Sequence, residues 1–223
     1  MSEWWTYSLT SFLLFSPRTY YRLFELHNVQ FWPLQLFTIA MGVAILLRTI
    51  FPAPWGGRII AAILSALWAI VAWTFLLQYY DTINFAARYF ALGFALQAAL
   101  LLGFGVIRDD LRAATGTITA KIGSALIAYA LVLHPLIAPL SGRPWTQAEI
   151  FGLAPDPTVI ATLGVLVTAA RPNWLLFIVP LAWCVISGLT LWTMESPEAP
   201  IVFVAGLLTI IALVASNRGE APR

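Results

Sequence analysis

Long apolar segments recur along this chain, and they constrain its fold more than any other feature. From Val29 to Ser216, apolar runs of helix-spanning length follow one another with only short polar breaks. Hydrophobic residues make up 61% of the sequence and charged residues only 10%, too few to cover the surface of a soluble domain of this size. We therefore predict an all-α, polytopic bundle of transmembrane helices, with membrane lipids as its partners.

Polar breaks divide the chain into three predicted regions. Residues 1–28 form an N-terminal interfacial segment, residues 29–216 the transmembrane bundle, and residues 217–223 a polar C-terminal tail. In the first region we expect an amphipathic helix at the level of the lipid head groups, because apolar and charged residues alternate there. Pro17 is expected to begin this helix and Ser16 to cap it.

About seven spans fit into the bundle region, with six as the alternative. A span needs roughly 20 apolar residues, and most segments reach that length. The fifth has only 13 residues, so it either begins earlier, within 150–154, or is a broken or re-entrant element. The expected spans are 29–50, 58–80, 85–107, 118–140, 158–170, 174–194 and 199–216.

The distribution of basic residues predicts an orientation. Seven spans place four of the 12 Lys and Arg residues on the N-terminal side and eight on the other. Because basic residues mark the cytoplasmic side, we predict a multi-pass membrane protein with its N-terminus outside and its C-terminus in the cytoplasm. Both histidines and seven of the ten carboxylates then lie on the outer side, where we expect a site.

Nine residues near this outer side are candidate ligand-binding residues. His134, in an apolar run, is either a ligand or proton-handling group, or a histidine satisfied by a neighbouring helix. Asp156, between two prolines, is either a rigid carboxylate at a cavity mouth or part of a helix cap. Asp81 either binds a cation or pairs with Arg88. The full set is Glu25, His27, Asn28, Trp32, Asp81, Asn84, His134, Asp156 and Thr158.

Other residue types exclude several functions. The only lysine, Lys121, lies at a loop, so no retinal Schiff base forms in the last span. The single cysteine, Cys184, cannot form a disulfide framework and is predicted to be a buried, inert thiol. The two histidines share no helical spacing, which makes a weak metal signal; metal and cofactor stay unassigned. A net charge of +2 and scattered arginines do not indicate nucleic-acid binding.

Four stretches of the chain resemble, in order, an uncharacterised bacterial membrane family known as DUF6064. In the first, an Asn is followed by a Trp-Pro pair that enters the first span, as in the family. The sequence departs from the family pattern at Phe85, where proline is expected, and at Asp156, where cysteine is expected. The resemblance implies a membrane-helix fold and carries no activity. The stretches are Phe24–Gln35, Ile83–Phe90, Phe151–Gly164 and Ile178–Trp183.

Three functions remain open at this stage. The leading hypothesis is a small transporter or ligand-binding membrane protein with an outward-facing polar site. The second is an accessory subunit of a larger membrane protein complex, which a flat exposed aromatic patch would favour. The third is a membrane-embedded enzyme, which a metal or water held by His134 and a carboxylate would favour. We prefer a non-enzymatic role, because the sequence contains no recognisable catalytic set.

Overall fold

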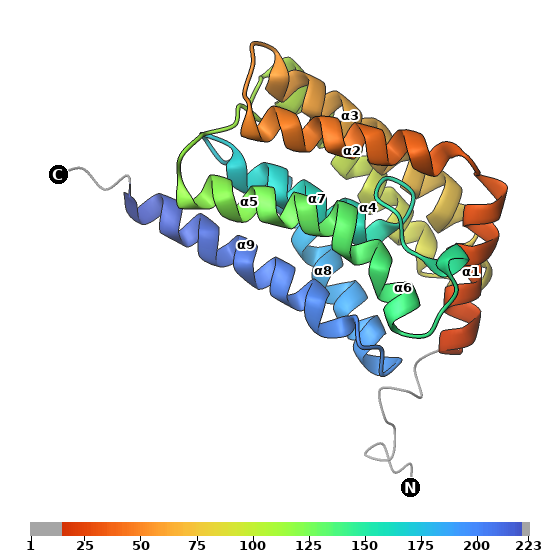
Figure 1. Cartoon of the computed structure of the whole chain (residues 1–223). Helices are drawn as coiled ribbons and strands as arrows, with labels where there is room; N and C mark the ends of the chain where they lie inside the picture. The colour runs from red at the N-terminus through yellow and green to blue at the C-terminus, as the bar shows by residue number, and fades with distance from the viewer. Residues whose placement is uncertain (1–14, 220–223) are drawn as a thin grey trace, which may run out of the picture.

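The computed structural model describes residues 15–219, with side chains as far as Ala215, and the described chain is built from helices without strands. Residues 1–14 of the predicted interfacial segment and the last four residues of the tail lie outside this range. The α-helices are α1 (Pro17–Gln30), α2 (Leu34–Ile50), α3 (Gly56–Ile70), α4 (Ala87–Leu100), α5 (Ile118–Ala128), α6 (Ile137–Leu140), α7 (Pro155–Thr168), α8 (Leu175–Thr193) and α9 (Ala199–Gly219) (Figure 1).

Three of these helices continue into π-helical segments, and short 3-10 turns lie between others. The π-helical segments extend α3, α4 and α5 and are Val71–Leu77, Leu101–Ile107 and Tyr129–Leu133. The 3-10 turns are Tyr80–Thr82, His134–Leu136 and Trp145–Gln147.

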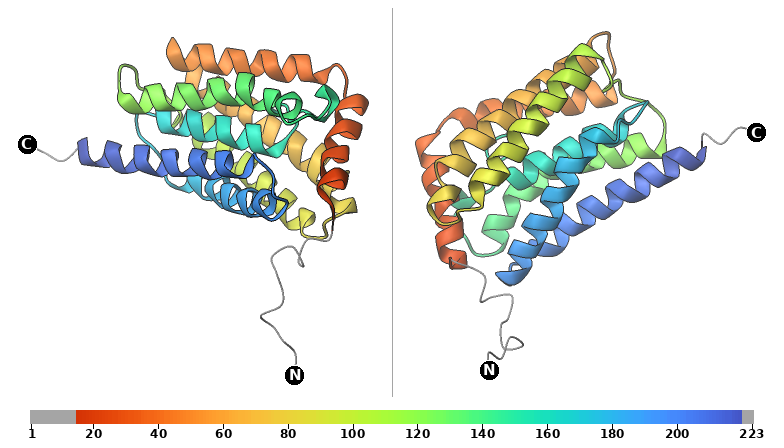
Figure 2. Two further views of the ribbon diagram at one scale, coloured as in Figure 1. Left: turned by 60° about the horizontal axis from the view of Figure 1, so that its bottom comes forward. Right: turned by 180° about the vertical axis from the view of Figure 1, so that it is seen from behind.

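The long helices lie side by side along one axis, and α1 lies across one end of them (Figures 1 and 2). We call this end the α1 end; the connections 78–86, 141–154 and 194–198 lie there. The opposite end, called the far end, carries the connections 51–55, 108–117 and 169–174 and the end of α9. The chain therefore alternates between the two ends.

Helix α7 is the centre of the bundle. Every residue from 151 to 169 is buried, and α7 contacts α3, α5, α8 and α9. Its contact with α5 is made by two glycines: a Cβ atom added at Gly164 would lie 2.6 Å from the carbonyl oxygen of Gly123. Small residues let two helices approach this closely. Such packing matters in a membrane, where the hydrophobic effect does not drive helices together.

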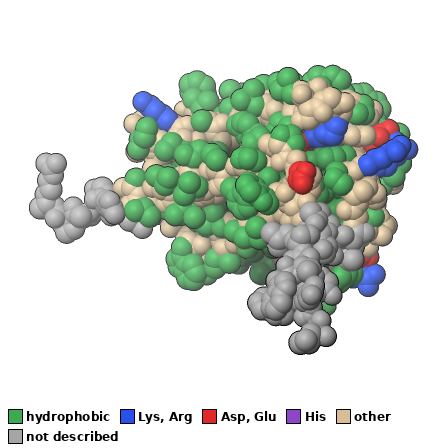
Figure 3. Space-filling model, turned by 90° about the horizontal axis from the view of Figure 1, so that it is seen from below, with side chains coloured by type: hydrophobic (Ala, Val, Ile, Leu, Met, Phe, Trp, Pro, Cys, Tyr) green, Lys and Arg blue, Asp and Glu red, His purple; other side chains and the backbone are tan. Residues whose placement is uncertain are grey.

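The outer faces of the helices are apolar, the reverse of a soluble protein. Large hydrophobic side chains such as Phe37 on α2, Leu92 on α4 and Trp192 on α8 are more than half exposed. Figure 3 shows one face, on which hydrophobic side chains predominate and charged ones are few. A surface of this kind is compatible with contact with lipid.

The number of spans is lower than the sequence predicts. Four helical stretches are long and apolar enough to cross a membrane, or five if α1 and α2, bent by 95°, form one broken span. The prediction of about seven is too high because α7 has only 14 residues, about 21 Å of helix, and the described apolar part of α9 is also short. The four stretches are Gly56–Thr82, Ala87–Ile107, Ile118–Leu140 and Leu175–Thr193.

Individual boundaries show where the sequence signals were sufficient. The backbone N–H of Thr19 donates to Ser16 Oγ at 3.2 Å, so the cap and proline start predicted for α1 are confirmed. The predicted start of the first span at Val29 is wrong, because the chain turns sharply at residues 31–33, where the Trp32–Pro33 peptide is cis. Helix α7 begins at Pro155, three residues before the predicted fifth span.

We expect Gly164→Ala to lower the melting temperature of the detergent-solubilised protein. The new methyl group would meet the Gly123 carbonyl, and overpacking of this kind costs about 1–3 kcal/mol. The matched control is Gly93→Ala in α4, whose new Cβ would have its nearest neighbour, Val179, at 3.9 Å. Equal melting temperatures for the two variants would contradict the close α5–α7 contact.

Candidate functional site

Two ionisable side chains come together inside the bundle near the α1 end, with a tyrosine beside them. Nε2 of His134 lies 3.7 Å from Oε2 of Glu149, and these side chains are only 3% and 4% exposed. The buried carboxylate of Asp156 lies farther away, within range of the electrostatic effect of both. The rings of Tyr129 and His134 meet edge to face, with centroids 5.9 Å apart. We call Tyr129, His134, Glu149 and Asp156 the carboxylate cluster.

His134 and Tyr129 share a side of their helix because the helix is irregular there. The segment Tyr129–Leu133 is π-helical, and a 3-10 turn follows at His134–Leu136. Pro135 cannot donate a backbone hydrogen bond and disfavours a regular helix around it. In a π-helix residues i and i+5 are one turn apart, which is the spacing of these two side chains.

Glu149 reaches the cluster on an irregular segment that enters the bundle before α7. Gly152 has φ +80°, and a Cβ there would lie 2.8 Å from a Leu67 methyl group, so only glycine fits this turn. Its N–H donates to Thr158 Oγ1 at 2.8 Å, and the Thr158 hydroxyl donates to the Ala154 carbonyl at 2.7 Å. Thr158 therefore shapes the turn between Glu149 and Asp156.

Asp156 is bound by α8 and does not cap α7. Trp183 Nε1 and Ser187 Oγ each donate to its carboxylate at 2.7 Å. The residue at the cap position of α7 is Ala154, which provides no side-chain bond. Two charge-assisted hydrogen bonds fix this carboxylate, so the helix-cap interpretation of Asp156 does not describe the structure.

The other members of the cluster have unpartnered atoms. Both oxygens of Glu149, Nδ1 of His134 and the hydroxyl of Tyr129 are buried without a hydrogen-bond partner among the described residues. Burying a polar atom without a partner costs free energy, so such a group indicates a place for a proton or ligand. In the described part of the chain, no three His, Cys, Asp or Glu side chains are arranged to hold a metal ion.

A pocket of about 530 Å³ lies at the bend between α1 and α2, next to the segment that carries Glu149. Its walls are mostly apolar, with Trp32 and Trp145 both more than half exposed. Gln35 Oε1 is buried there and has no partner within the described chain. Ile150 also lines this elbow pocket, while the preceding residue, Glu149, belongs to the carboxylate cluster.

Helix α1 holds the segment that separates the pocket from the cluster. Asn28 Nδ2 donates to the carbonyls of Thr146 at 2.9 Å and Ala148 at 2.8 Å. Gln147 Nε2 donates to Glu25 Oε2 at 3.1 Å. Two of the residues that the sequence proposes as ligands, Asn28 and Glu25, thus hold the three residues just before Glu149.

Three other candidates have local partners away from the cluster. His27 Nε2 lies 3.0 Å from Thr74 Oγ1, among aromatic rings. Asp81 pairs with Arg88, whose Nε donates at 2.9 Å, as the pairing alternative predicts. Asn84 Oδ1 accepts the N–H of Ala86 at 3.0 Å, just before α4.

The nine candidate residues predicted from the sequence do not include Tyr129, Glu149, Trp183 or Ser187. Glu149 is one of the seven carboxylates that the predicted topology places on the outer side, and no local pattern distinguishes it from the others. Tyr129 and His134 are five residues apart. Two residues at this spacing lie on different sides of an α-helix but on the same side of a π-helix. No local pattern links Trp183 and Ser187 to Asp156, because their contact is set by tertiary packing.

We expect Asn28→Ala to speed backbone hydrogen exchange at residues 146–149, because two carbonyls there lose their shared donor. Mass spectrometry of peptides covering this segment measures the effect. Asn84→Ala is the control, since that side chain bonds only near the start of α4 and the exchange change should stay there. Unchanged exchange at 146–149 in the first variant would show that α1 does not hold the segment.

Comparison with known proteins gives a family and no activity. A family model described as a family of unknown function, DUF6064, matches residues 18–221. No match was found among curated proteins or among solved structures. The matched range includes all but the first residue of α1, the elbow pocket and the whole carboxylate cluster, so this chain belongs to the DUF6064 family.

Proposed function

We propose that this chain is a multi-pass membrane protein of transport type, which binds a small, largely apolar solute in the elbow pocket and a proton at the carboxylate cluster. One observation carries the proposal. The carboxylate of Glu149 is 4% exposed and has no hydrogen-bond partner in the described structure, yet it lies beside His134 and directly precedes a residue of the pocket wall.

A proton is the ligand that best suits His134 and Glu149. An unpaired charge in a buried site costs several kcal/mol, and a proton shared between imidazole and carboxylate removes that cost. A small rotation closes the 3.7 Å separation to hydrogen-bond distance. Acidic and histidine side chains inside membrane helices mark proton pathways in many pumps and carriers.

The elbow pocket suits a small molecule with an apolar body. Its volume of about 530 Å³ falls in the range of small-molecule sites, roughly 300–1,000 Å³. The indole rings of Trp32 and Trp145 offer apolar faces at its edge. Gln35 lines the pocket, and its buried Oε1 has no hydrogen-bond partner among the described residues. A rotation of the amide that exposes this acceptor would favour a solute with one hydrogen-bond donor, such as an amide, amine or hydroxyl group.

One segment connects the two sites and would couple them. The segment 145–150 forms part of the pocket wall and contains Glu149. The chain then continues through residues 151–156 to Asp156 and α7. Non-helical backbone at membrane depth is tolerated where protein covers it, and broken helices line solute sites in many secondary transporters. Displacement of this segment by a solute would change the surroundings of Glu149 and hence its contact with His134.

The proposed location is a bacterial inner membrane, with the α1 end outside. Basic residues are more numerous at the far end, which supports this orientation. At the α1 end the described basic residues are Arg18, Arg22, Arg88 and Arg143, and at the far end they are Arg48, Arg58, Arg108, Arg112, Lys121 and Arg171.

The contact between His134 and Glu149 also makes a membrane-embedded enzyme a second candidate, with the pair as a general base. An enzyme of this kind needs a nucleophile within hydrogen-bond reach of the base. No hydroxyl or thiol of the described residues is hydrogen-bonded to His134. We therefore favour transport.

We expect Glu149→Gln to abolish solute-driven proton movement. Proteoliposomes with a pH-sensitive dye inside would be exposed to a panel of small amides, amines and alcohols. For a solute that moves protons with the wild type, loss of a positioned proton-transfer group should slow the flux by about 100-fold or more. Glu195→Gln, which makes the same change at an exposed position of the α1 end, should retain it. Wild-type flux in Glu149→Gln would contradict the proton role.

The orientation is tested by reporters fused after Arg223. We expect a fluorescent protein that folds only in the cytoplasm to be bright there and alkaline phosphatase, active only in the periplasm, to be inactive. The reverse pattern would place the elbow pocket on the cytoplasmic side. A reporter pair at the loop 113–117 is a control, because it lies at the same end of the bundle.

A further inference from the structure

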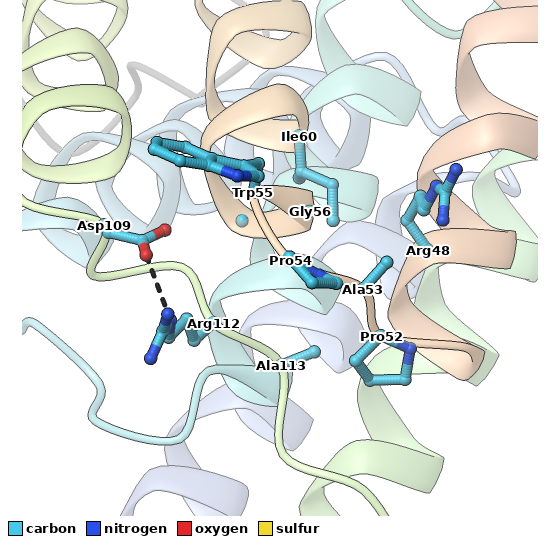
Figure 4. Close-up of a pocket in the computed structure, with 11 residues that line it drawn as sticks. Arg48, Pro52, Ala53, Pro54, Trp55, Gly56, Ile60, Asp109, Arg112 and Ala113 are labelled. Atoms are coloured by element: carbon cyan, nitrogen blue, oxygen red, sulfur yellow. Dashed lines mark hydrogen bonds and ion pairs between the residues drawn. The ribbon is translucent and has the colours of Figure 1, made fainter.

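A second pocket lies at the far end of the bundle, away from the carboxylate cluster (Figure 4). It has a volume of about 340 Å³ and lies between the end of α2, the start of α3 and the connection after α4. Its wall includes Arg48, Trp55, Gly56, Asp109 and Arg112. We call it the arginine pocket. The transport proposal makes no use of it.

Guanidinium groups outnumber carboxylates around this pocket. Arg112 Nε donates to Asp109 Oδ2 at 3.0 Å (Figure 4). Arg58, which adjoins the pocket, has its Nε 3.9 Å from Oδ1 of the same carboxylate, and that Nε atom is buried without a hydrogen-bond partner in the described structure. Two arginines therefore share one carboxylate, and the charge of the group is positive.

Arg48 adds a third guanidinium with no carboxylate of its own. It projects from the last turn of α2, on the other side of the 52–55 connection from Arg112 (Figure 4). Among the described residues it forms no ion pair or side-chain hydrogen bond. Its fork of donors is available to an anion, and arginine forks match phosphate oxygens in pairs.

The start of α3 adds backbone donors to the same pocket. Trp55 precedes the helix in a left-handed conformation, φ 64°, and no side chain caps the first turn. Gly56 and Gly57 line the pocket, and a Cβ added at Gly56 would have no atom within 4 Å. The N–H of Gly56 donates to the Ala53 carbonyl at 2.9 Å, so the N–H groups of Gly57 and Arg58 and the positive end of the helix dipole are what favour an anion at this place.

We propose that the arginine pocket binds a phosphate group. A phosphate offers enough oxygens for two arginine forks and the amides of α3, whereas a carboxylate has only two oxygens. The group has two sources, an anionic phospholipid of the cytoplasmic leaflet or a soluble phosphate. The exposed side chains of Phe51 and Trp55 place the pocket at the level of lipid head groups, where arginine-lined pockets bind them.

Native mass spectrometry of the purified full-length protein tests the proposal, with phosphatidylglycerol, phosphatidylcholine and inorganic phosphate as separate probes. We expect the wild type to prefer phosphatidylglycerol over phosphatidylcholine, and Arg48→Gln to weaken its binding by about tenfold, because the phosphate loses a charge-assisted hydrogen bond. Arg171→Gln is the control, because that arginine is exposed at the same end and outside the pocket. It should bind as the wild type does.

Gly56→Asp separates a ligand site from a general effect of charge or folding. The carboxylate would enter open space and favour the start of a helix, so the variant should fold while it loses phosphatidylglycerol. Binding of inorganic phosphate that depends on Arg48, without a lipid preference, would support the pocket and identify a soluble source. Equal binding of both lipids without phosphate binding, or equal losses in Arg48→Gln and Arg171→Gln, would overturn the proposal.

Discussion

The contact between α5 and α7 at Gly123 and Gly164 is the interaction on which the rest of the structure depends. It brings two helix backbones within van der Waals distance and lets α7 lie wholly inside the bundle. Because α7 is enclosed, the chain before it must also enter the protein, and that segment carries Glu149, while Asp156 lies in the first turn of α7 itself. The polar cluster is thus a consequence of the tight packing of an apolar helix, since a looser contact would leave its carboxylates near the surface.

The sequence predicts the helices well wherever a local signal marks their ends. Ser16 and Pro17 fix the start of α1, and the stretch Ile118–Leu140 agrees with the expected fourth span. It predicts too many spans, because an apolar run does not reveal whether lipid or protein surrounds it. Helix α7 is apolar because protein, and not lipid, surrounds it. Its 14 residues are enough for a helix that is buried in protein. The length rule for membrane spans considers only helices that cross lipid.

The site was harder to predict than the fold, and the reason differs between residues. His134 and Asp156 stand out as ionisable groups in apolar surroundings, which is a local property. Glu149 has no such signal, because its burial follows from the path of residues 148–154 through the protein. Asn28 and Glu25 were expected to bind a ligand and instead hold that path. The sequence therefore locates the polar end of the bundle. It does not distinguish residues that would contact a ligand from residues that position the backbone.

Each of the three π-helical segments in the described chain lets the two parts of its helix present their side chains in independent directions. In an uninterrupted α-helix, a side chain that faces the core fixes the direction of every later one. The wider turn at Tyr129–Leu133 breaks this dependence, so the half of the helix that packs on α7 and the half that carries His134 are rotated separately. One helix can therefore keep its packing face while the residues at its polar end change, without any rebuilding of the bundle.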